Sequence, residues 1–94
     1  MNQKEIDFYK RLKEELDTTT QFPTVYLFKF IVPVSEEKVL QIKTSFAGTN
    51  AQIVTKASST GKFNSVSVKV MMPSSQSVID KYVELSSIDG IISL

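Results

Sequence analysis

Polar and apolar residues alternate along the segment Phe63–Met72. Valine stands at positions 66, 68 and 70, and the positions between and before them hold Ser65, Ser67 and Lys69. Because successive side chains of a strand point to opposite faces, this pattern predicts a β-strand with one buried and one polar face. Such strands are typical of antiparallel sheets that are covered on one side only. We therefore expect the chain to fold around a sheet of this kind.

Three further segments have the composition of strands. Thr24–Val32 is rich in β-branched and aromatic residues and apolar on both faces, which is typical of a central strand. Ala51–Ala57 is separated from Phe63–Met72 only by the turn Ser58–Lys62, which predicts a hairpin. A turn signal before Ile91–Leu94 predicts a short last strand.

Three segments have the periodicity of amphipathic helices. The first covers residues 3–17. The second follows Ser35, and the third follows Ser74 or Ser75 and runs through Ser87, with these serines as helix caps. The apolar residues expected on the buried faces are Ile6, Phe8, Tyr9, Leu12 and Leu16 in the first helix, Val39, Ile42 and Phe46 in the second, and Val78, Ile79, Tyr82 and Leu85 in the third.

The expected element order is therefore α-β-α-β-β-α-β. Two β-α-β halves joined by a hairpin predict an α+β, ferredoxin-like βαββαβ fold, with a four-stranded antiparallel sheet and two helices on one face. A chain of 94 residues has room for one domain. We expect residues 1–21 to form an N-terminal helix and connector, and residues 22–94 to form the core.

Composition excludes several classes of function. The chain has 11 basic and 10 acidic residues, a balance that disfavours DNA binding. It contains neither histidine nor cysteine, so the usual general base and the usual zinc ligands are missing. The acids Glu14, Glu15, Glu36, Glu37 and Glu84 fit helix starts or solvent-facing helix positions. We expect no enzyme activity, no metal site and no cofactor.

The same composition predicts where the protein resides. A small secreted domain would usually carry disulfides, and the residues after Met1 lack the apolar run of a signal peptide. The longest apolar run, Val25–Phe28, is far shorter than a membrane span. We expect a cytoplasmic protein without a membrane partner.

A mixed surface is expected on the side of the sheet that faces away from the two core helices. Its members come from the two central strands and from the hairpin turn. They are Lys29, Phe63, Ser65, Ser67 and Lys69 on the strands and Ser58, Ser59, Thr60, Gly61 and Lys62 in the turn. This surface could be solvated, covered by the N-terminal helix, or bound by a partner. For the N-terminal helix, we favour packing on its own domain over docking on another copy.

The hairpin turn and the sheet each raise a second hypothesis. Ser58–Lys62 could place hydroxyls, N–H groups and a cation around an anion, but a turn that needs glycine for a positive φ is the favoured interpretation. The sheet could bind RNA, as related domains do through aromatics on these strands. Serine stands where a second exposed aromatic is needed, so RNA binding is disfavoured.

Two motifs resemble the YbeD-like family of small bacterial proteins of unknown function. They are Phe22-Pro23-Thr24 and the run from Ser58 to Val68, and the ending Ile88-Asp89-Gly90-Ile91 agrees with them. The resemblance covers nearly the whole chain, although Ala57, Thr60 and Phe63 depart from the residues common there. It implies a fold like the ACT domain, with a regulatory or small-ligand role. The loop Pro33-Val34-Ser35-Glu36 lacks the glycine usual in ACT ligand sites, so amino-acid binding is not carried over.

These observations lead to two functional hypotheses. The first is a non-enzymatic regulatory or adaptor module that binds another protein through the open side of the sheet, the N-terminal helix and the turn Ser58–Lys62. The alternative is an ACT-like sensor of a small ligand at the interface of a homodimer. Catalysis and RNA binding rank below both.

Overall fold

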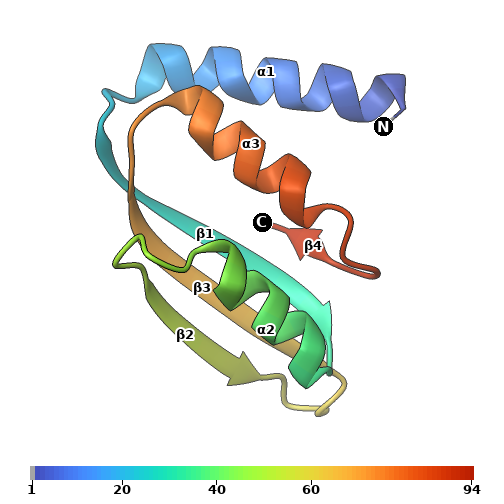
Figure 1. Ribbon diagram of the computed structural model, residues 1–94. Helices are drawn as coiled ribbons and strands as arrows, with labels where there is room; N and C mark the ends of the chain where they lie inside the picture. Colours follow the sequence, from blue (N-terminus) through green and yellow to red (C-terminus); the bar gives the residue numbers. More distant parts are fainter. Residues whose placement is uncertain (1) are drawn as a thin grey trace.

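The predicted order of helices and strands is confirmed. The computed structural model describes residues 2–94, and Met1, the first residue of the expected N-terminal segment, lies outside the described residues. The elements shown in Figure 1 are α1 (Gln3–Thr19), β1 (Thr24–Pro33), α2 (Glu36–Ser45), β2 (Gln52–Ala57), β3 (Phe63–Met72), α3 (Ser75–Leu85) and β4 (Ile92–Ser93). Their ends differ from the predicted ones by at most two residues.

The four strands form one antiparallel sheet in the order β2-β3-β1-β4. β1 and β3 pair over their full lengths, from Thr24 opposite Met72 to Pro33 opposite Phe63. The prediction that these two strands are central is therefore confirmed. β4 is much shorter, because it pairs only through Ile92 and Ser93 with β1.

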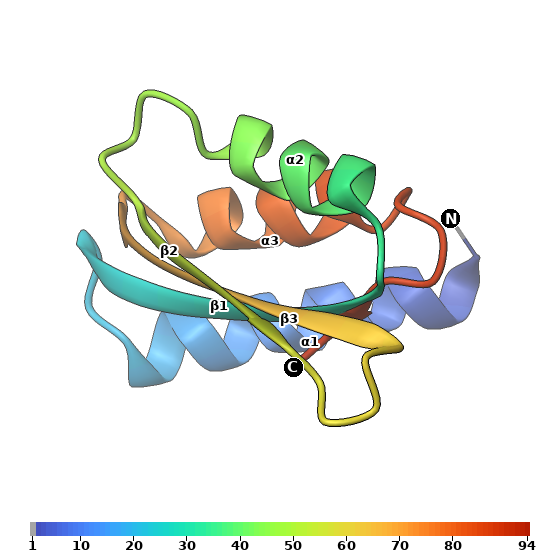
Figure 2. The ribbon, with the colours of Figure 1, turned by 90° about the horizontal axis from the view of Figure 1, so that it is seen from below.

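The core lies between the sheet and the two helices α2 and α3, which Figure 2 shows together on one side of the sheet. Phe28 is fully buried, and its ring lies 5.2 Å from that of Phe46 at the end of α2 and 5.3 Å from that of Tyr82 in α3. Burial of such aromatic and branched side chains is the main stabilising contribution to the fold. The inward residues expected on α2 and α3 are all buried.

Serine side chains fix where the two core helices begin. The Ser35 hydroxyl accepts a hydrogen bond from the Lys38 N–H at 3.2 Å and caps α2. Ser74, rather than Ser75, caps α3: its hydroxyl accepts from the Ser77 N–H at 3.1 Å, and the Ser77 hydroxyl accepts from the Ser74 N–H at 3.2 Å. This reciprocal pair satisfies two N–H groups that a helix start leaves without partners.

The N-terminal helix α1 packs on its own domain, against α3 and on the side of α3 that is away from α2 (Figure 1). Leu16 is buried in the core, while Ile6 and Phe8 at the other end of the helix are exposed. The Ser75 hydroxyl of α3 donates a hydrogen bond to Asp17, and this bond, together with Lys13, lowers the pKa of the Asp17 carboxyl. Since α1 lies beside α3, it leaves the far side of the sheet uncovered. Only part of the expected apolar stripe is buried.

Candidate binding surface

The uncovered side of the sheet is formed by alternate residues of all four strands, and we call it the open face. Strand pairing and burial assign its members. They are Val25, Leu27, Lys29 and Ile31 of β1, Phe63, Ser65, Ser67, Lys69 and Met71 of β3, Gln52, Val54 and Lys56 of β2, and Ile92 of β4. Leu27 and Val54 are the most exposed of its apolar side chains, at 60% and 64%.

The structure brings together the strand residues that the sequence predicted for this surface. Lys29 of β1 lies directly opposite Ser67 of β3, and Lys69 lies opposite Leu27. Ser65 is paired with Ile31, and Phe63 ends the same row of β3 next to the hairpin turn. These five predicted residues therefore share one face of the sheet.

The predicted turn residues lie at one end of the open face. Gly61 has a φ of +72°, as expected for a turn that needs glycine. The Ser58 hydroxyl accepts from the Phe63 N–H at 3.1 Å, and the Gly61 N–H donates to the Ser58 carbonyl at 3.0 Å. The Thr60 hydroxyl accepts from the Lys62 N–H at 3.4 Å. These three N–H groups thus have acceptors inside the turn, and the structure shows the hairpin turn that the sequence favoured.

A hollow joins the turn to the open face. Its volume is about 390 Å³, and it is lined by Ile31, Lys56, Ala57, Ser58, Ser59, Phe63 and Ser65. These residues come from β1, β2, β3 and the hairpin turn. The turn and the open face thus make one continuous surface.

The prediction missed several members of the open face. Val54 and Lys56 come from β2, Val25 from the start of β1, and Ile92 from β4. The hairpin could have revealed the two β2 residues, since pairing across a short turn places residues 54 and 56 opposite Ser67 and Ser65. The pairing of β4 has no comparable signal, because its partner is distant in the sequence.

Most apolar side chains of the open face lie toward its two ends, whereas Val54 lies in the middle row with Lys29 and Ser67. Val25 and Met71 are directly opposite each other at one end of the face, beside Leu27. Ile31 and Ile92 are paired at the other end, near Phe63. Of the three lysines, Lys29 lies between the two ends, Lys69 lies opposite Leu27, and Lys56 lies on the edge strand β2. The surface therefore offers apolar contacts at both ends and positive charge across the middle.

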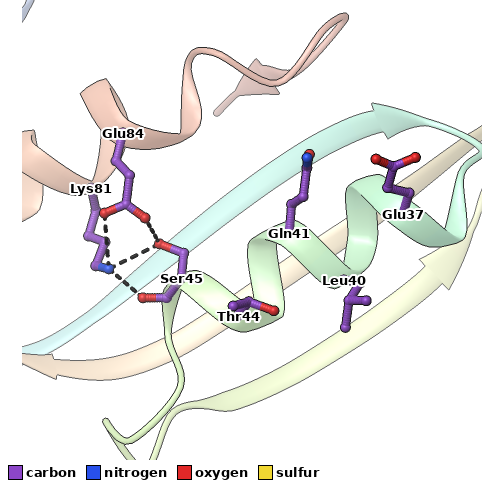
Figure 3. Close-up of a pocket in the computed structure, with 7 residues that line it drawn as sticks. All are labelled: Glu37, Leu40, Gln41, Thr44, Ser45, Lys81 and Glu84. Carbon is purple, nitrogen blue, oxygen red and sulfur yellow. Dashed lines mark hydrogen bonds and ion pairs between the residues drawn. The ribbon is translucent and has the colours of Figure 1, made fainter.

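A hollow of about 510 Å³ lies elsewhere, between α2 and α3, and Figure 3 shows the residues that line it. Lys81 of α3 donates hydrogen bonds to the carbonyl and the hydroxyl of Ser45, the last residue of α2, and pairs with Glu84 at 3.4 Å. Its ammonium group also lies 5.0 Å from the centre of the Phe46 ring. A cation at the carboxyl end of a helix is stabilising. This cluster ties the two helices together, and its charged groups are already paired.

A smaller hollow of about 230 Å³ lies where α1 and α3 meet the edge of the sheet. It is lined by Phe8, Tyr9, Leu12, Tyr26, Tyr82, Ser93 and Leu94. The hydroxyls of Tyr26 and Tyr82 are 3.0 Å apart and hydrogen-bonded to each other. Burial, and then the hydrogen bond with Tyr26, raise the pKa of the Tyr82 hydroxyl. We call this hollow the aromatic hollow.

Two further features bear on function: side chains that could hold a metal ion, and helices that could span a membrane. Among residues 2–94, no group of three or more acidic, histidine or cysteine side chains is placed to hold a metal ion. None of the helices in this part of the chain combines the length and the hydrophobicity of a membrane span.

Comparison with known proteins places the chain in a family. The family model described as "Protein of unknown function (DUF493)" matches residues 17–94. The chain belongs to this family. A UPF0250 protein of Shewanella halifaxensis is 28% identical over 83 residues, which cover 85% of this chain and 94% of the relative. The comparison with solved structures gave no significant match. The resemblance to the YbeD-like proteins, which are the DUF493 and UPF0250 proteins, is thereby confirmed.

The DUF493 match spans the whole ferredoxin-like core and the end of α1. It therefore includes every strand that contributes to the open face, and the hairpin turn beside it. Neither the family description nor the name of the relative states an activity.

Proposed function

We propose that this DUF493 protein is a non-enzymatic regulatory or adaptor module of the cytoplasm, which binds another protein through the open face. The observation that carries the proposal is the set of exposed aliphatic side chains on the side of the sheet that no helix of residues 2–94 covers. Exposed clusters of apolar side chains on one side of a sheet typically mark a site of interaction.

The chemistry of the side chains supports binding rather than catalysis. The chain has no histidine and no cysteine, so a catalytic base would have to be a carboxylate or a lysine. Lys81 and Glu84 bond to each other and to Ser45. On the open face, the polar side chains are serines, lysines and a glutamine, which suit contacts with a partner.

Paired variants test the proposal. Leu27→Ser combined with Val54→Ser removes apolar surface from the open face without touching the core. Leu40→Ser is the matched control, because Leu40 is 61% exposed but lies on α2. We expect affinity purification from the source organism to recover a protein with the wild type and with the control, and to lose it with the double variant. Proteins recovered equally with all three would contradict the proposal.

A second candidate function is the binding of a small ligand, and the aromatic hollow favours it. Aromatic walls with a few convergent polar groups are typical of small-molecule sites. The hydroxyl pair of Tyr26 and Tyr82 would bind a polar group of the ligand, and the surrounding rings would contact its apolar part. By the resemblance to ACT domains, such a ligand would bind at the interface of a homodimer.

Thermal unfolding with small phenols, indoles and aromatic acids tests this second function. A compound at about 100 times its Kd should add roughly 2.7 kcal/mol to the free energy of unfolding. Tyr26→Phe should weaken the effect, whereas Phe63→Leu on the open face should not. Unchanged unfolding across the set, with a monomeric mass by light scattering, would contradict a ligand-sensing dimer.

A further inference from the structure

We propose that the occupant of the open face is an acidic amphipathic helix of a partner protein, with apolar side chains near both ends and carboxylates between them. This inference rests on the proposed function and specifies the chemistry of the partner. Three properties of the open face carry it: the distribution of charge, the position of most apolar side chains toward the two ends, and the length of the face.

The charge of the molecule is divided between its two sides. All ten acidic residues lie on the three helices or in the loop after α3. The strands contain none, and they carry Lys29, Lys56 and Lys69, with Lys62 in the adjoining turn. The ion pairs found within residues 2–94, Lys13–Asp17 and Lys81–Glu84, lie on the helices. The lysines of the open face are therefore available to carboxylates of a partner, and such complementarity determines which partners bind.

The pattern on the face sets the pattern of the partner. One end of the face is formed by Leu27, Val25 and Met71, and the other by Ile31, Ile92 and Phe63. Lys29 lies between the two ends in the same row as Val54, and Lys69 lies opposite Leu27. A partner that buries its own apolar residues at both ends must place negative charge in the middle, because a buried lysine without a partner is costly.

The dimensions of the face favour a helix. From Val25 to Ile31 the face extends about 20 Å along β1, at roughly 3.3 Å per residue. A helix of about 13 residues has the same length. A helix satisfies its own backbone hydrogen bonds, whereas an extended segment on the surface of a sheet would leave N–H and carbonyl groups without partners. The face of the sheet therefore suits a helix of three to four turns.

Other occupants fit less well. Single-stranded nucleic acid binds by stacking its bases on several aromatic rings. Among the named members of the open face, Phe63 is aromatic and the other apolar residues are not. A membrane surface would require the cations at the rim, whereas Lys29 and Lys69 lie on the two central strands. A second copy bound face to face would bring the two sets of lysines together.

Photo-crosslinking in living cells tests the inference. A benzophenone amino acid is placed at Leu27, and separately at Ile92, at the two apolar ends of the open face. The same amino acid at Leu40 on α2 is the control. Crosslinked species are purified, and the attached peptide is sequenced by mass spectrometry. We expect both open-face positions to attach the same helical segment, with more Asp and Glu than Lys and Arg, and the control to attach nothing in common with them.

The outcomes separate the inference from the function on which it rests. An attached segment without an acidic excess, or one that is not helical, overturns the inference and leaves protein binding intact. Attachment of nucleic acid, of lipid or of a second copy overturns both the inference and the choice of partner class. Absence of any species specific to the open face overturns the proposed function and the inference with it.

A synthetic peptide of the attached segment then gives a quantitative test. Lys29→Gln combined with Lys69→Gln should weaken peptide binding about 5- to 10-fold, as expected for the loss of two surface ion pairs. Lys4→Gln with Lys10→Gln on α1 makes the same change in net charge and should leave the affinity within about 2-fold. Raising the salt concentration should weaken wild-type binding and narrow the difference. Equal affinities for the two double variants would overturn the role of the open-face lysines.

Discussion

The side chain of Tyr82 is buried, and its hydroxyl forms a hydrogen bond with the hydroxyl of Tyr26. Burial, and then its hydrogen bond with Tyr26, raise the pKa of Tyr82 above the usual value of tyrosine. A tyrosine in the unfolded chain loses its proton near pH 10. At higher pH the folded state keeps a proton that the unfolded state has lost, so the contribution to stability is present below pH 10 and disappears as the pH rises.

We expect the free energy of unfolding to fall above about pH 10, by up to about 1.4 kcal/mol per pH unit from this group. Denaturant titrations between pH 8 and pH 11 measure the slope. Tyr82→Phe should reduce the slope above pH 10 while costing about 0.5–1.5 kcal/mol at neutral pH through the lost hydrogen bond. An identical slope in the variant would show that Tyr82 ionises equally in both states.

Two glycines with the same backbone conformation differ in their surroundings. Gly48 and Gly90 have φ values of +79° and +80°. A Cβ at Gly90 would lie 2.8 Å from Cγ of Pro33, whereas a Cβ at Gly48 would meet nothing within 4 Å. We expect Gly48→Ala to cost about 1–2 kcal/mol, the penalty of the left-handed region for an L-residue, and Gly90→Ala to cost more. Equal shifts in chemical denaturation would mean that Pro33 moves aside freely.

At the scale of whole elements, α1 is buried most deeply near its carboxyl end. Leu16 is buried against the core, whereas Ile6 on the same helix is 45% exposed. Leu16→Ala should cost about 2–3 kcal/mol and speed amide hydrogen exchange along α1. Ile6→Ala, the control on the same helix, should change stability by less than about 0.5 kcal/mol. If both variants behave alike, α1 is attached through contacts other than those of Leu16.

The sequence predicted the elements and the arrangement of the core, but left open which surface α1 covers. Local patterns such as the alternation around Val66 and Val68 define strands directly, because burial follows the period of the backbone. The amphipathic stripe of α1 shows that a face is to be buried, but not against which surface. Its docking depends on Leu16 and on the bond between Ser75 and Asp17, residues 58 positions apart in the sequence. For this reason the sequence did not decide whether α1 covers the open face. The structure shows that the open face is exposed.

The candidate surface was predictable to a similar degree. Lys29, Ser67 and Lys69 follow from strand alternation alone, whereas Ile92 requires the pairing of two distant strands. The aromatic hollow was out of reach, because Tyr9, Tyr26 and Tyr82 converge there from three separate elements. No local pattern records such a convergence.

At the scale of the molecule, we expect like charges to keep the open faces of two copies apart. Replacing Lys29, Lys56 and Lys69 by glutamine changes the net charge from +1 to −2, since three positive charges are lost. We expect this variant to self-associate through its apolar ends, with a weight-average mass that rises with concentration in sedimentation equilibrium. The same replacement of Lys4, Lys10 and Lys43, on helices, gives the same net charge and should leave the mass constant. If both triple variants self-associated to the same extent, the change in net charge, rather than the position of the lysines, would explain the association.

The division of charge also has a consequence for kinetics. The four lysines of the strands and the hairpin turn carry +4, so the remaining seven basic and ten acidic residues carry −3. The protein is therefore an electric dipole, although its net charge is only +1. In the field of an acidic partner a dipole experiences a torque, which turns the strands toward the partner before the two surfaces touch. Collisions would thus begin in the productive orientation more often than chance allows, and this advantage in association rate would fade as salt is added.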